Sequence, residues 1–234
     1  MKVLAVDTST AILHIALLND DNLDVRMIKK DGQHSEELLS EIKSILRESN
    51  ISFKDLNLLV ATRGPGSFTS LRIGFSTLKG ISLALGIPLV SVPTLQVIAE
   101  ATPDYPAIKI SVIDAKKKRY YIGIYKDGKL IKDLDGNAED ILDEIKNESS
   151  ILVTGPDATA FSNKLSALID PKVKIITDDQ CFRPLGGVMV KLGIDQYHSQ
   201  GEDDIGQGPV YIRRSDAEEA LLKKLANEDN KWKM

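Results

Sequence analysis

Short apolar runs alternate along the chain with longer segments of helical spacing. Near the N-terminus, three apolar runs separated by turns rich in Asn and Asp predict strands. Three strands joined by such short turns are typical of an antiparallel meander. A predicted helix, strand, helix and strand follow the meander. These elements cover residues 2–6, 11–18, 23–29, 34–49, 58–62, 69–85 and 89–92.

The same order of elements recurs in the second half of the chain. A shift of 107 residues places Asp7 on Asp114, and it also places Asp20 on Asp127. We therefore predict an α/β fold in which a β-β-β-α-β-α-β unit occurs twice, since this order gives mixed sheets covered by helices. One doubly wound sheet with decorations is the alternative. The second set of elements covers residues 108–113, 120–125, 130–134, 137–146, 151–154, 157–168 and 173–176.

Two prolines near residues 101–106 interrupt the pattern and predict a domain boundary. We expect an N-terminal domain at residues 1–103 and a C-terminal domain at residues 104–234. The C-terminal domain ends in less regular segments, namely helical spacing at residues 183–198, a polar loop at 201–209, a charged amphipathic helix at 216–226 and a tail at 227–234.

Composition places the chain among ordinary globular proteins and excludes several classes. Of its 234 residues, 42% are hydrophobic and 27% are charged, which excludes a disordered or fibrous chain. The net charge of −4 argues against a nucleic-acid binder of the basic-patch kind. The single Cys181 excludes an internal disulfide and a thiolate metal cluster. No targeting segment or membrane-spanning run is visible, so we expect a cytoplasmic location.

A glycine-rich turn connects the predicted strand at residues 58–62 to the long helix after it. Gly64 and Gly66 allow a close backbone approach, and Ser67 precedes a helix start whose N–H groups and dipole favour an anion. The turn matches neither G-x-G-x-x-G nor the P-loop pattern. A tight turn that leads into a capped helix is therefore the alternative.

Small residues form two stripes on this helix and its entry. Glycine inside a helix costs about 1 kcal/mol relative to alanine, so glycines there require a packing reason. We expect one stripe to face the chain's own sheet and the other to face a partner helix, and internal packing of both is the alternative. The stripes are Gly66, Ser70, Gly74 and Ser76, Gly80, Ala84.

Several segments match motifs of a known family, and on them the chain resembles the TsaB (YeaZ) family. Members of that family have the duplicated fold of the actin–Hsp70–sugar-kinase (ASKHA) superfamily. The likeness is dense in the N-terminal half and sparse in the C-terminal half, and Ser70 stands where the family commonly has glycine. The motifs are LAVDTST at residues 4–10, QHSE at 33–36, RGPGSFTSLRIG at 63–74, KG at 79–80, PLVSV at 88–92, PVYIR at 209–213 and DAE at 216–218.

The resemblance implies a non-catalytic role. The related TsaD proteins bind a catalytic metal through two histidines four residues apart, and Thr94 and Ile98 occupy those positions here. Neither side chain can replace an imidazole as a metal ligand. We therefore expect no catalytic residue and no metal site. The expected role is that of a scaffold in the complex that installs threonylcarbamoyl on the adenosine next to the anticodon of tRNAs.

The resemblance also implies partners. Family members pair with a TsaD-like catalytic subunit, which a TsaE-like ATPase joins, and they form homodimers in its absence. Contact with tRNA is expected only through the complex, and no membrane is involved. We expect the contact surface on the helices at residues 34–49 and 69–85. Its expected members are Leu38, Glu41, Ile42, Ile45, Arg72, Ile73, Phe75, Ser76, Lys79, Gly80 and Leu83.

A nucleotide site is a further expectation from the superfamily. Its members use an aspartate after the first strand to hold the metal–water shell of a nucleotide, and Asp7 stands in that place. The second phosphate turn should be glycine-rich but is AKKKR at residues 115–119, which argues against a normal ATPase site. No cofactor is required, although weak or partner-dependent ATP or ADP binding is compatible with the fold. The candidate anion-binding residues are Asp7, Thr8, Ser9, Gly64, Gly66 and Ser67.

Alternatives stay open for the basic turn and for the function. Residues 116–119 form either a solvated hairpin or a contact for an acidic partner or an RNA backbone. The alternative function is that of a small ASKHA-fold kinase or nucleotide hydrolase that acts alone. A metal-dependent peptidase is a third interpretation, which the missing histidines oppose.

Overall fold

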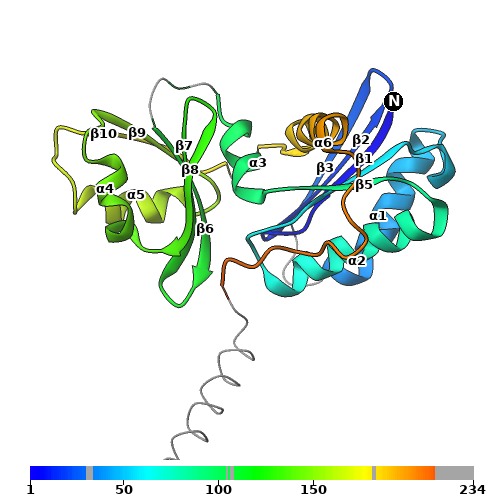
Figure 1. Ribbon diagram of the computed structural model, residues 1–234, viewed down its shortest axis with the longest axis horizontal. Coiled ribbons are helices and arrows are strands. Elements are labelled where there is room, and N and C mark those ends of the chain that lie inside the picture. The colour runs from blue at the N-terminus through cyan, green and yellow to red at the C-terminus, as the bar shows by residue number, and fades with distance from the viewer. Residues whose placement is uncertain (30–33, 104, 106–107, 181–182, 214–234) are drawn as a thin grey trace, which may run out of the picture.

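Two five-stranded sheets, each covered by helices, form the two halves of the molecule (Figure 1). The computed structural model describes residues 1–29, 34–103, 105, 108–180 and 183–213. The strand order is β3-β2-β1-β4-β5 in the first sheet and β8-β7-β6-β9-β10 in the second. Because the two orders are the same, the predicted duplicated unit and the ASKHA-like α/β fold are confirmed.

Each sheet is an antiparallel meander extended by two parallel strands. The first sheet contains β1 (Lys2–Asp7), β2 (Ile12–Asn19), β3 (Asn22–Lys29), β4 (Leu58–Thr62) and β5 (Leu89–Val92). The second contains β6 (Ile108–Lys116), β7 (Arg119–Lys126), β8 (Lys129–Gly136), β9 (Ser150–Thr154) and β10 (Lys174–Asp178).

Helices connect and cover the strands, and among those described none is long and apolar enough to span a bilayer. The longer ones are α1 (His34–Glu48), α2 (Phe68–Leu85), α3 (Thr94–Ala101), α5 (Ala158–Ser166) and α6 (Gly186–Gln200). Short helical turns are η1 (Phe53–Asp55), η2 (Ala138–Ile141) and α4 (Leu142–Ile145).

Alternating side chains on β1 show how the first sheet is buried on both faces. Leu4 and Val6 belong to a core with α1 and α2, whereas Val3 and Ala5 belong to a core with α6. This alternation is the period of two that a strand imposes on its side chains. A strand covered on both faces contains few polar residues, which is why residues 3–6 are a continuous apolar run.

The two halves exchange their last helices. Helix α3, which ends the first unit, packs against β6 and β7 of the second sheet. Helix α6, which follows the second unit, packs against β1, β2, β4 and β5 of the first sheet, where Figure 1 shows it (amber). Side chains of α3 and α6 therefore share one core with the first sheet. The division into domains at residue 103 stays a prediction, and this exchange crosses it.

A buried polar cluster closes the junction between the halves. The side-chain nitrogen of Gln180 lies 2.8 Å from the Ile98 carbonyl oxygen, 2.6 Å from Thr102 Oγ1 and 2.7 Å from Thr154 Oγ1. The two threonine hydroxyls lie 2.7 Å apart. Arg183 adds a bond to the Ala101 carbonyl and an ion pair with Asp178. The end of α3 is thus fixed to β9, β10 and the connection to α6.

Three parts of the structure differ from the sequence expectations or fall outside them. Helix α3 has no counterpart among the expected elements, because it has only eight residues, most of them buried, and so short an apolar segment gives no clear helical period. The helix expected at residues 137–146 consists of the short turns η2 and α4. The amphipathic helix expected at residues 216–226 lies outside the described residues.

We expect Thr154→Val to lower the free energy of unfolding by about 1–3 kcal/mol, because it removes a buried hydroxyl and leaves its partners unsatisfied. Chemical denaturation measures this change. Thr159→Val, on the exposed side of α5, is the matched control and should change stability by less than about 0.5 kcal/mol. Equal effects of the two substitutions would contradict a stabilising role of the buried polar cluster around Gln180.

Candidate functional site

The turn after β1 is closed rather than open to a ligand. Asp7 Oδ1 accepts hydrogen bonds from the Ser9 amide at 2.8 Å and from Thr62 Oγ1 at 2.6 Å. Thr8 Oγ1 donates to the Ser70 carbonyl at 2.7 Å, which joins the turn to the first turn of α2. Asp7, Thr8 and Ser9 are all buried, and within the described residues Asp7 Oδ2 and Ser9 Oγ have no hydrogen-bond partner.

Two glycines allow α2 to approach this turn. A Cβ added at Gly66 would lie 2.7 Å from Ser9 Cβ, and one added at Gly74 would lie 3.0 Å from Thr8 Cγ2. The Ser67 amide donates to the Ser9 carbonyl at 2.7 Å. The stripe that contains Gly66 and Gly74 therefore faces the chain's own sheet, as the sequence predicted.

Gly64 meets a different segment, the C-terminal strap (residues 201–213). Its φ is +100°, and an added Cβ would lie 2.8 Å from the Val210 carbonyl oxygen. The Val210 amide donates to the Arg63 carbonyl at 2.7 Å, so the strap is hydrogen-bonded to the glycine-rich turn. Of the six candidate anion-binding residues, only Ser67 is exposed. The space beside Gly64 and Gly66 is therefore occupied by the backbone of other segments of the chain.

The predicted partner surface divides into a buried and an exposed set. Leu38, Ile42, Ile45 and Phe75 are at most 3% exposed and lie in the core between the first sheet and helices α1 and α2. Leu38, Ile42 and Ile45 cannot touch a partner while the chain is folded, which corrects their place in the expected surface, and Phe75 reaches solvent only where it lines a pocket beside α2. Their spacing on α1 is that of any core-facing helix. Glu41, Ile73 and Lys79 are partly exposed, and Arg72, Ser76, Gly80 and Leu83 are exposed.

Arg72 is held at the N-terminal end of the exposed side of α2. Its guanidinium lies 4.0 Å from the centre of the Phe68 ring, and its Nε donates to the Tyr211 hydroxyl at 3.0 Å. The rings of Phe68 and Tyr211 stack with their centres 4.2 Å apart. This cation–π and stacking arrangement attaches the strap to α2.

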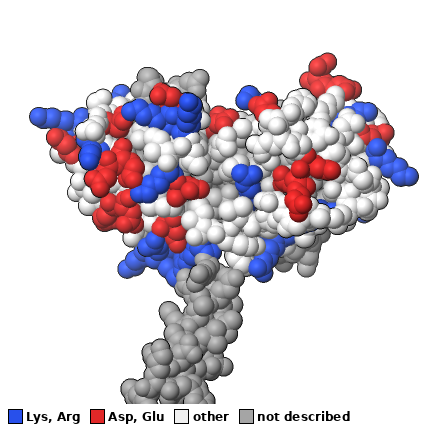
Figure 2. All heavy atoms as spheres, viewed as in Figure 1, with Lys and Arg blue, Asp and Glu red and all other residues white. Residues whose placement is uncertain are grey.

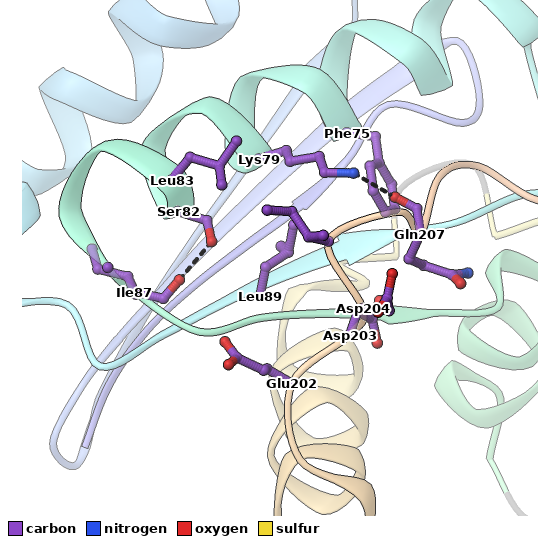
Figure 3. A pocket seen from close by; sticks show the side chains of 12 residues that line it. Phe75, Lys79, Ser82, Leu83, Ile87, Leu89, Glu202, Asp203, Asp204 and Gln207 are labelled. Carbon is purple, nitrogen blue, oxygen red and sulfur yellow. Dashed lines mark hydrogen bonds between the residues drawn. The ribbon is translucent and has the colours of Figure 1, made fainter.

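A pocket of about 340 Å³ lies between the C-terminal half of α2 and the strap (Figure 3). Leu83 and Ile205 are among its apolar lining residues, and Glu202 and Asp204 are among its acidic ones. Lys79 Nζ donates to the Gln207 carbonyl at 2.8 Å and closes one end. The Asp203 amide donates to the Leu89 carbonyl at 2.9 Å and holds the strap against β5.

Exposed residues of α2 and the strap together form one surface, which we name the α2 face. Large apolar side chains lie open on it, since Leu83 is 59% and Ile205 is 69% exposed. An added Cβ at Gly80 meets no atom within 4 Å. Helical spacing could not have indicated Ile205 and Tyr211, because they come from an irregular segment far along the chain. The α2 face consists of Arg72, Ser76, Gly80, Leu83, Ile205 and Tyr211.

Thr94 and Ile98, which we expect at the positions of the metal-binding histidines of TsaD, lie in the interior. Thr94 and Ile98 are at most 1% exposed, and the Thr94 amide donates to the Gly64 carbonyl at 2.9 Å. Within the described part of the chain, no group of three or more His, Cys, Asp or Glu residues is arranged to hold a metal ion.

His14 is buried opposite Asp7 in the β1–β2 pair. Burial lowers the pKa of the imidazole below its usual 6.5, and the nearby Asp7 carboxylate opposes that shift only in part. His34, by contrast, begins α1, and its side chain lies outside what the structure describes.

The two helix glycines should respond oppositely to alanine. We expect Gly74→Ala to lower the free energy of unfolding by about 1–2 kcal/mol, because crowding against Thr8 outweighs the helix propensity that alanine adds. Gly80→Ala should raise it by up to about 1 kcal/mol, because the added methyl meets open space. Urea denaturation of the pair tests the assignment, and a loss of stability in Gly80→Ala would refute it.

Stability should fall as the pH drops below about 6.5, because the unfolded chain then binds a proton on His14 more readily than the folded chain does. The stabilising contribution is complete above that pH and is lost as the pH falls through the lowered pKa of His14 in the folded chain. His14→Leu should flatten this dependence in thermal unfolding followed between about pH 5 and pH 7.5. His198→Gln, at the exposed end of α6, should leave it unchanged.

Comparisons with known proteins identify the family of the chain. A family model described as "TsaD: tRNA N6-adenosine threonylcarbamoyltransferase" matches residues 29–180. The chain is 29% identical over 227 residues to "tRNA threonylcarbamoyladenosine biosynthesis protein TsaB" of Bacillus subtilis (strain 168). This alignment covers 93% of this chain and 96% of that protein. It is 32% identical over 128 residues to the protein of the same name from Escherichia coli (strain K12), covering 54% of this chain and 55% of that one.

Solved structures share the fold. A Pseudomonas aeruginosa protein described as having similarity to peptidase YEAZ superposes with a TM-score of 0.77 at 21% identity, over 91% of this chain and 99% of that chain. YeaZ from Pseudomonas aeruginosa superposes with a TM-score of 0.72 at 21% identity, over 90% of this chain and 99% of that chain. The chain therefore belongs to the TsaD family, and within it to the TsaB/YeaZ group.

Proposed function

We propose that this chain is a non-catalytic subunit in the biosynthesis of threonylcarbamoyladenosine in tRNA, and that it pairs with a TsaD-like catalytic subunit through the α2 face. The exposure of that face is the observation that carries the proposal. Two large apolar side chains of a folded chain, Leu83 and Ile205, lie open side by side on the rim of one pocket. Exposed apolar surface of this kind marks sites of protein association.

The backbone of α2 supports a helix-to-helix contact. Ser76, Gly80 and Ala84 form an exposed stripe without large side chains. A partner helix can approach such a stripe closely, since side-chain size sets the distance between packed helices. Leu83 and Ile205 lie beside the stripe and supply apolar area for the contact. Without the catalytic subunit, the same face pairs two copies of this chain.

The absence of a catalytic role rests on Thr94 and Ile98. Both are buried and neither offers a nitrogen ligand, so this chain supplies no pair equivalent to the histidines of TsaD. The chemistry is assigned to the TsaD-like partner, a TsaE-like ATPase joins the complex, and the complex acts on tRNA in the cytoplasm.

We expect Gly80→Arg to abolish co-elution with the purified TsaD-like subunit in size-exclusion chromatography, because a long cation occupies the stripe. Its circular dichroism spectrum should stay native, since the position is open. Leu83→Glu should weaken the complex by at least tenfold, whereas Leu130→Glu, an equally exposed apolar site on β8, should have no effect. Normal assembly of both α2 variants would reject this surface.

A stand-alone kinase or nucleotide hydrolase is the competing function, and calorimetry separates the two. Titration with ATP and magnesium should give no tight binding, because protein atoms fill the space around Asp7, Gly64 and Gly66. Magnesium-dependent binding with turnover by the purified chain would replace the scaffold proposal.

A further inference from the structure

The β6–β7 hairpin ends in three consecutive lysines with left-handed backbone conformations. Lys116, Lys117 and Lys118 have φ values of 63°, 54° and 65°. Lys116 pairs with Arg119, so Lys117 and Lys118 are the two central residues of the turn. Positive φ at both central positions is the arrangement of a type I′ turn, which strongly prefers Asn and Gly.

A second hairpin in the same sheet has the residue types that a type I′ turn prefers. The β7–β8 turn lies between Lys126 and Lys129 and has Asp127 and Gly128 at its centre, with φ values of 51° and 71°. Asp-Gly is a favoured pair for this turn. Lysine has a Cβ that disfavours positive φ and no short polar group to offset it. The β6–β7 turn therefore contains lysines at positions where the backbone conformation disfavours them. This indicates that the positive charge of these side chains has a function.

The lysines project from a braced base. Arg119 Nε lies 2.7 Å from Asp135 Oδ1, and Arg213 Nε lies 3.8 Å from Asp135 Oδ2. Arg213 also donates to the Ala115 carbonyl at 3.2 Å, so the end of the strap supports the hairpin. Lys117 and Lys118 are exposed beyond this base, and Lys116 is also exposed although its Nζ lies 3.0 Å from Asp114 Oδ2.

The β6–β7 turn is strongly basic although the chain as a whole is acidic. The net charge is −4, yet residues 116–119 are four consecutive cations. Figure 2 shows Lys and Arg side chains gathered along the lower edge of the second half, where the strap reaches the described limit of the chain. Asp114 and Asp135 lie at the base of the hairpin, where they pair with Lys116 and Arg119.

We propose that the lysine turn, Lys116–Lys117–Lys118, contacts the phosphate backbone of tRNA. The inference rests on the proposed function only in taking tRNA as the nucleic acid that the complex handles. Lysine offers a flexible point charge that suits phosphate oxygens without reading bases. The turn thus orients the RNA and leaves sequence recognition to other parts of the complex.

The test converts the turn to the favoured residues. Lys117→Asn combined with Lys118→Gly should raise the melting temperature of the full chain, because both residues accept positive φ. The same variant should bind an unmodified tRNA transcript at least threefold more weakly in fluorescence anisotropy at low salt. The slope of log K against log salt should decrease by about two, because two phosphates are no longer neutralised by lysine.

A charge-matched control separates the turn from the overall charge. Lys172→Gln with Lys174→Gln removes two exposed cations beside β10 and should leave tRNA affinity within about twofold of the unaltered chain, since neither lysine belongs to the turn. Each titration is made with the chain alone and with the TsaD-like subunit added. Because the turn variant keeps the α2 face, it should still co-elute with that subunit, so failure of this proposal and of the pairing proposal are distinguishable.

Three outcomes would overturn the assignment. Unchanged tRNA affinity of the turn variant in both settings would show that the lysines do not contact RNA. Equal weakening in the turn variant and the Lys172/Lys174 control would show a general effect of charge. Failure to assemble with the protein partner at unchanged tRNA affinity would assign the turn to an acidic protein surface instead.

Discussion

The reciprocal exchange of α3 and α6 is the constraint on which the rest of the structure depends. Each sheet buries one face under a helix that the other unit supplies, so neither half completes its core alone. Gln180 and the hydroxyls of Thr102 and Thr154 fix the crossing point with hydrogen bonds shielded from water. Buried hydrogen-bond networks of this kind favour one arrangement of the units. The exchange also directs the chain after α6 back across the first sheet, where it forms the strap and the edge of the α2 face.

Elements with strong local signals could be predicted from the sequence. The meanders are indicated by apolar runs and by Asp turns, and Asp20 and Asp127 have nearly equal φ values of 54° and 51°. Helix α3 could not be predicted, because it spans only eight residues and periodicity alone does not separate so short an apolar segment from a strand. Its partner sheet follows from tertiary packing that no local pattern encodes.

The candidate sites could also be predicted only where the signal is local in the sequence. The two small-residue stripes are visible in the sequence, but only the fold shows that Gly74 meets Thr8 and that Gly80 meets open space. Apolar residues of α1 such as Ile42 are expected on a contact surface from the sequence, and burial assigns them to the core. Ile205 and Tyr211 join α2 through the strap, a contact across more than a hundred residues that sequence spacing cannot reveal.

The strap has a consequence for the solubility of the chain. Strand β5 lies at the edge of the first sheet, and all four of its residues are buried. An open edge of this composition is a template on which other chains can add strands and aggregate. The Asp203 amide donates a hydrogen bond to the Leu89 carbonyl, and the Asp203 carboxylate accepts one from the Ser91 hydroxyl. The strap therefore covers this edge of the sheet and places a negative charge beside it. The strap, which contributes Ile205 and Tyr211 to the α2 face, thus also covers the edge of the sheet and disfavours its pairing with strands of other chains.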